Sequence, residues 1–158
     1  MLISWNVTKK CNLSCQHCYR DSGPDVDIKD ELTTEEGKKL LSQIKSAGFK
    51  LMIFSGGEPL MREDIFELAA YAKEIGLYPV LGTNGMLLTE NICKKLSESG
   101  VKGIAVSLDS VNPMYHDKFR NMTGAWEKSV EGIRNAIHAG IRVQINMTIT
   151  KYNADYFN

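Results

Sequence analysis

Short apolar segments alternate along this chain with longer amphipathic segments, and this alternation limits the possible folds more than any other feature. The apolar segments, which we predict to be strands, are residues 2–7, 51–55, 78–82, 103–107 and 142–149. The amphipathic segments, which we predict to be helices, are residues 32–47, 64–75, 89–99 and 126–139, each followed by a glycine. Strands that alternate with helices of this length form a parallel sheet with right-handed crossovers. The predicted class is therefore α/β, either an open doubly wound sheet or a βα barrel.

Two of the predicted helices carry further local signals. Thr33 and Glu36 have the spacing of a capping box at the start of the first helix. In the last helix an apolar stripe of Trp126, Val130, Ile133 and Ile137 is expected to face the sheet.

Polar or glycine-rich motifs follow four of the five predicted strands. A group of cysteines follows the first strand, and residues 56–59, 83–85 and 107–109 follow the next three. Because the carboxyl ends of parallel strands meet at one edge of a sheet or barrel, we expect these motifs to converge on one active site.

The composition is that of one ordinary globular domain. The chain has 158 residues, 43% of them hydrophobic and 24% charged, and its 19 basic side chains balance 19 acidic ones. The sequence therefore predicts no nucleic-acid partner, no membrane span and no signal peptide, and a cytoplasmic location. In that compartment clustered cysteines indicate a metal site rather than disulfides.

Three of the four cysteines, Cys11, Cys15 and Cys18, lie within eight residues. Three thiolates on one loop can hold an iron–sulfur cubane and leave one iron open to another ligand. A structural zinc site that recruits His17 or His116 is the alternative. Cys93 lies beside apolar residues on a predicted helix, which favours a buried structural thiol.

The Cys-x3-Cys-x2-Cys spacing, with Gly56-Gly57-Glu58-Pro59 and the motifs at residues 83–85 and 107–109 in this order, resembles the signature of the radical SAM superfamily. Within it, residues 5–13, 54–60 and 116–120 resemble the branch of haem-biosynthesis and peptide- or cofactor-maturing enzymes. The resemblance covers essentially the whole chain.

This resemblance implies a [4Fe–4S] cluster on Cys11, Cys15 and Cys18, with S-adenosylmethionine (SAM) chelating the open iron. In the family, one electron then cleaves SAM to methionine and a 5′-deoxyadenosyl radical, which abstracts hydrogen from the substrate. The implied substrate is a tetrapyrrole, a peptide or a cofactor precursor. A reductant such as ferredoxin or flavodoxin is the implied protein partner, and a non-catalytic zinc or iron–sulfur module is the alternative function.

Further residues receive SAM-binding roles from the resemblance. Gly56, Gly57 and Glu58 are expected to line the methionine amine, and Ser107 and Asp109 to bind the ribose or the carboxylate.

Four other residues complete the predicted SAM site. Arg120, after a short loop, is expected to face the methionine carboxylate, and Asn146, on the inward face of a buried strand, to contact the nucleoside. His17 and Tyr19 are expected to lie near the adenine.

The family barrel has six βα units, whereas five strands can be counted here. We therefore expect residues 1–158 to be an incomplete radical SAM core, a partial TIM-like barrel that stops after about five strands. A substrate-specific C-terminal domain would lie beyond it. The last strand would then be an exposed apolar edge, so self-association or poor order near residues 143–149 is expected.

Overall fold

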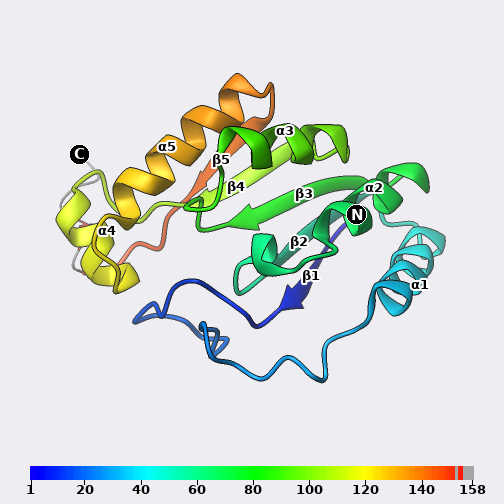
Figure 1. Ribbon diagram of the computed structural model, residues 1–158, viewed down its shortest axis with the longest axis horizontal. Helices are drawn as coiled ribbons and strands as arrows, with labels where there is room; N and C mark the ends of the chain where they lie inside the picture. Colours follow the sequence, from blue (N-terminus) through cyan, green and yellow to red (C-terminus); the bar gives the residue numbers. More distant parts are fainter. Residues whose placement is uncertain (152, 155–158) are drawn as a thin grey trace.

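The chain forms one five-stranded parallel sheet with helices packed on one side of it (Figure 1). A computed structural model describes residues 1–151, 153 and 154. The strands are β1 (Leu2–Thr8), β2 (Leu51–Gly56), β3 (Tyr78–Thr83), β4 (Gly103–Ser107) and β5 (Arg142–Asn146). The crossover helices are α1 (Thr34–Ser46), α2 (Ile65–Glu74), α3 (Glu90–Glu98) and α5 (Ala125–His138).

The strand order is β1-β2-β3-β4-β5, so every strand pairs with its neighbours in sequence. A doubly wound sheet reverses its order at a switch point. No reversal occurs between β1 and β5, and right-handed crossovers in one direction place their helices on the same face. The fold is thus a partial (β/α) barrel, and the barrel is the correct choice of the two predicted architectures.

The core lies between the sheet and these helices. Its fully buried members include Met52 and Phe54 on β2, Leu68 on α2 and Leu96 on α3. Cys93 belongs to the same cluster with no exposed surface, as predicted for a structural thiol. The predicted capping box is present, with the Thr33 side chain accepting from the backbone of Glu36.

Three predictions about the elements are wrong. An unpredicted helix, α4 (Pro113–Arg120), precedes α5, and β5 ends at Asn146 rather than at residue 149. In α5, Ile137 is 58% exposed and does not face the sheet. The buried face of α5 consists instead of small residues, Ala125, Ser129, Gly132 and Ala136, because a Cβ on Gly132 would already overlap the Gly85 carbonyl.

A 3-10 turn, η1 (Pro59–Met61), follows β2. Within the described part of the chain, no helix combines the length and the apolar character that crossing a bilayer requires.

Candidate functional site

A cavity of about 480 Å³ lies at the carboxyl ends of the strands. Every strand-end segment contributes to its lining, and Cys11, Cys15 and Cys18 come from the loop after β1. Of the other predicted site residues, those that also line it are His17, Tyr19, Gly56, Gly57, Ser107, Arg120 and Asn146. Glu58 and Asp109 are not among the lining residues.

The first part of the cysteine loop is held on both sides by backbone hydrogen bonds. On one side the Cys11 N–H donates to the Gly23 carbonyl over 2.9 Å. On the other side the Gly57 N–H donates to the Thr8 carbonyl over 2.7 Å, and the Glu58 N–H to the Lys10 carbonyl over 2.8 Å. The place of the first cysteine is therefore fixed by backbone contacts.

These contacts explain why two glycines follow β2. A Cβ on Gly56 would overlap the Thr8 carbonyl, and one on Gly57 would overlap the Lys10 carbonyl. Gly56 also has a φ of +136°, which L side chains rarely adopt. Both glycines line the cavity, and in addition they let the cysteine loop approach the sheet.

Glu58 has a different position from the one predicted. Its side chain is fully buried and does not line the cavity. The carboxylate accepts two hydrogen bonds from the Thr83 hydroxyl, at 2.8 and 2.9 Å, and one from the Asn84 N–H. Burial raises the pKa of Glu58 to about 7, although these donors oppose the shift. Its contacts support a role in holding the loop after β3.

Thr83 and Asn84, at the end of β3 and in the loop after it, contribute more to the cysteine site than the sequence analysis predicted. The Asn84 amide donates to Asn12 over 2.7 Å and lies 4.0 Å from the Cys11 sulfur. The sequence does contain the motif Thr-Asn-Gly after a strand, but this motif is typical of simple turns as well as of binding loops.

Asp109 and Arg120 form a buried ion pair beside the second cysteine. The Arg120 Nε and Nη2 atoms each lie 2.6 Å from Asp109 Oδ2, and the side chains of Arg120 and Asp109 are 10% and 2% exposed. Asp109 Oδ1 accepts from the Thr148 N–H. The third guanidinium nitrogen, Arg120 Nη1, lies 3.8 Å from the Cys15 sulfur. Asp109 is thus occupied by protein donors, and it does not line the cavity.

The thiols differ in their surroundings. Burial raises the pKa of Cys11 to about 11, and burial also raises the pKa of Cys15 although the Arg120 cation opposes it. For Cys18, burial acts to raise the pKa, but hydrogen bonds from backbone N–H groups outweigh it and the pKa is lowered. The thiolate, which is the form that binds metal, is favoured most at Cys18.

The remaining predicted contacts lie around the rim. His17 stacks on Phe119 of α4, with ring centroids 4.0 Å apart and planes within 2°. Tyr19 is 83% exposed, and its hydroxyl accepts from Arg20. Asn146 lines the cavity from the edge strand β5, where it is exposed; its expected burial is wrong because no described strand covers that edge.

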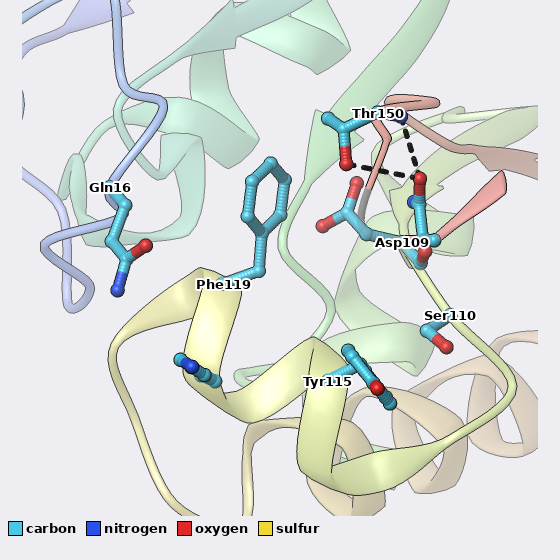
Figure 2. A pocket seen from close by; sticks show the side chains of 8 residues that line it. Gln16, Asp109, Ser110, Tyr115, Phe119 and Thr150 are labelled. Atoms are coloured by element: carbon cyan, nitrogen blue, oxygen red, sulfur yellow. Dashed lines mark hydrogen bonds between the residues drawn. The ribbon is translucent and has the colours of Figure 1, made fainter.

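A second, smaller cavity of about 240 Å³ lies next to the ion pair and is shown in Figure 2. Phe119 and Tyr115 reach it from α4, Gln16 from the cysteine loop, and Asp109 from the end of β4 (Figure 2). Phe119 was not predicted as a site residue, since only the position of α4 brings it to the cysteine loop.

The residues around the cysteines fit an iron–sulfur cluster. Buried polar atoms without a partner occur among the described residues at His17 Nδ1, Arg20 Nη1 and Ser22 Oγ, and all three residues line the cysteine cavity. Such atoms indicate that the cavity accommodates a polar group.

A cysteine-lined cavity at the carboxyl edge of a partial barrel defines an α/β-barrel enzyme built around a metal cofactor. The sequence model of the radical SAM superfamily matches residues 5–157. The chain belongs to this superfamily, whose enzymes use a [4Fe–4S] cluster and SAM, so the predicted family and cofactors are confirmed.

Similar proteins include enzymes of haem biosynthesis. The chain is 45% identical over 152 residues to Fe-coproporphyrin III synthase of Methanosarcina barkeri, covering 96% of this chain and 38% of the relative. It is 36% identical over 152 residues to pre-heme d1 synthase of Dinoroseobacter shibae, covering 37% of that relative. The chain therefore spans less than half the length of these relatives.

Among solved structures, Streptococcus suis SuiB bound to S-adenosylmethionine has the same fold. The TM-score is 0.81 at 19% identity, and the match covers 98% of this chain and 35% of that protein.

Proposed function

We propose that this chain holds the cluster and SAM of a radical SAM enzyme, with Cys11, Cys15 and Cys18 as the iron ligands. The observation that carries the proposal is the cavity itself, where three thiols and the Gly56-Gly57 backbone face one space at the strand ends. The bound cofactors would supply one-electron cleavage of SAM to methionine and a 5′-deoxyadenosyl radical.

The protein groups around that space would bind and orient SAM. The backbone at Gly56 and Gly57 can approach an ammonium group closely, and Ser107 and Asn146 offer polar groups from the ends of β4 and β5. The stacked pair of His17 and Phe119 offers a flat aromatic surface beside the cysteines, which suits a purine.

We propose a tetrapyrrole as the substrate of the whole enzyme. The relatives named AdoMet-dependent heme synthase are 40–45% identical to this chain, whereas mycofactocin maturase and PqqA peptide cyclase are 30% and 31% identical. We propose that segments of the enzyme outside residues 1–158 choose the substrate, and that a ferredoxin or flavodoxin supplies the electron. The clustered free cysteines support a cytoplasmic location.

One anaerobic experiment tests the core of the proposal. The chain is loaded with iron and sulfide, reduced with dithionite, and assayed for 5′-deoxyadenosine and methionine after addition of SAM. We expect about four irons per chain and SAM-dependent formation of both products. Cys15→Ala should abolish the formation of both products. Cys93→Ala, which removes the buried thiol of α3, should abolish the formation of neither. A colourless zinc protein would show the alternative function instead.

A further inference from the structure

Two of the three cysteine sulfurs, those of Cys11 and Cys15, accept a hydrogen bond from a side-chain N–H donor. At Cys11 the donor is neutral, because it is the Asn84 amide, which lies 4.0 Å from the sulfur. At Cys15 the donor is the Arg120 guanidinium, with Nη1 at 3.8 Å from the sulfur. Among these hydrogen bonds of the described residues, the one to Cys15 therefore comes from a cation and the one to Cys11 does not.

The position of this cation is fixed by the fold. Arg120 is the last residue of α4, and two of its nitrogens are bound to the buried carboxylate of Asp109. Asp109 is held in turn by the Thr148 N–H. Because the fork geometry of a guanidinium fixes all three nitrogens together, binding Asp109 through Nε and Nη2 directs Nη1 toward Cys15.

We propose that Arg120 sets the reduction potential of the cluster by placing a positive N–H donor against the sulfur of Cys15. This inference rests on the proposed function, since it requires the cluster to be bound there. Uptake of one electron from the reductant adds one negative charge to the cluster and its thiolates. A nearby cation and a hydrogen bond to a ligand sulfur stabilise the more negative state, so they raise the potential.

Asp109 limits this effect, because its negative charge lies next to the guanidinium. The carboxylate oxygen contacts Nε and Nη2, which leaves Nη1 as the atom nearest the sulfur. The cation is thus closer to Cys15 than its counter-ion is, and removing the pair as a whole should lower the potential.

The test is an anaerobic redox titration of the loaded chain, followed by electron paramagnetic resonance, in the absence of SAM. Arg120→Gln alone would leave Asp109 buried and unpaired, so we use the double variant Arg120→Gln/Asp109→Asn, which replaces the ion pair with neutral amides. Arg120→Lys is the second variant, because a lysine can pair with Asp109 but has no second arm for Cys15. Lys118→Gln, which removes another cation of α4, is the matched control.

We expect the potential to become more negative in the double variant and, by a smaller amount, in Arg120→Lys, while Lys118→Gln stays at the wild-type value. Equal potentials in all four proteins, at equal iron content, would overturn the inference. So would an equal shift in Lys118→Gln, which would indicate an effect of net charge alone. A weaker affinity for SAM at an unchanged potential would assign Arg120 to the methionine carboxylate instead. Failure of the wild-type chain to bind a cluster would contradict the proposed function.

Discussion

At the scale of single residues, the cysteine site depends on backbone contacts that only glycine permits. A Cβ at Gly57 would overlap the carbonyl oxygens of Lys9 and Lys10, which lie directly before the first cysteine. The chain must therefore move the cysteine loop away from β2 to accommodate any side chain there. The glycine motif therefore affects metal binding, because it determines the position of the cysteine loop.

Gly57→Ala is expected to destabilise the fold by about 1–3 kcal/mol and to lower the iron content after reconstitution. Gly103→Ala is the control, because the nearest atom to its Cβ would be 3.7 Å away and its φ is not positive. Iron analysis and urea denaturation of both variants check the prediction. Full iron binding by Gly57→Ala would show that the loop does not need this close approach.

Glu58 is a buried carboxyl group whose proton affinity differs between the folded and the unfolded chain. Its pKa is raised from 4.5 to about 7 by burial. Between these values the folded protein keeps a proton that the unfolded chain has released, so the free energy of unfolding falls as pH rises. The contribution is complete below pH 4.5, is lost by pH 7, and amounts to about 3 kcal/mol.

We predict that Glu58→Gln removes this dependence. The stability of the wild-type protein relative to Glu58→Gln should fall between pH 4.5 and 7 and stay level above pH 7. Chemical denaturation of both metal-free proteins across this range measures the difference. Parallel curves would mean that Glu58 titrates as it does in the unfolded chain.

At the scale of the elements, α4 connects the cysteine site to the start of α5. The carboxylate of Asp117, on α4, accepts hydrogen bonds from the backbone N–H groups of Gly124, at 2.6 Å, and Trp126, at 2.8 Å. Gly124, at the N-cap of α5, has no side chain to cap the helix itself. Asp117 supplies the missing cap from the preceding helix.

Asp117→Ala should therefore cost about 1–2 kcal/mol of stability, the usual cost of losing an N-cap. Glu131→Ala, an exposed position in the middle of α5, should change stability by less than about 0.5 kcal/mol. Urea denaturation of the two variants compares them directly. Equal losses would show that the contacts of Asp117 contribute nothing beyond those of a surface carboxylate.

The sequence predicted the strands and the convergence of their motifs, because these follow from local apolar periodicity. It failed for α4, although Asn112 before Pro113 is a usual helix start, because the helix is short and its apolar pattern is weak. It also failed for Ile137, since a stripe of large residues was expected where small residues pack closely. The pairing of Asp109 with Arg120 depends on the turn of α4 and could not be predicted without it.

At the scale of the whole molecule, the sheet has two edges, β1 and β5. β5 pairs with β4 alone among the described strands, and Ile145 on it is 44% exposed. Ile149, just beyond the strand, is 59% exposed. An edge with exposed backbone and apolar side chains favours pairing with another chain.

We propose that this chain self-associates through β5, and we predict that Ile145→Lys reduces the association. Light scattering over a range of concentrations should show a rise in mass for the wild-type chain and a smaller rise for the variant. Ile28→Lys is the control, because Ile28 is 43% exposed but lies in the loop between β1 and α1. A monomeric wild-type chain at all concentrations would refute the proposal.

The backbone contacts on both sides of Cys11 also affect how strongly a cluster can be held. The Gly23 carbonyl on one side, and the N–H groups of Gly57 and Glu58 at the end of β2 on the other, bind the backbone of residues 8–11. The first ligand therefore loses its conformational entropy during folding, and this loss does not weaken the later binding of iron. Affinity for the cluster is in this way linked to the stability of the β1–β2 pair, so a mutation that loosens these strands far from any cysteine should also release iron.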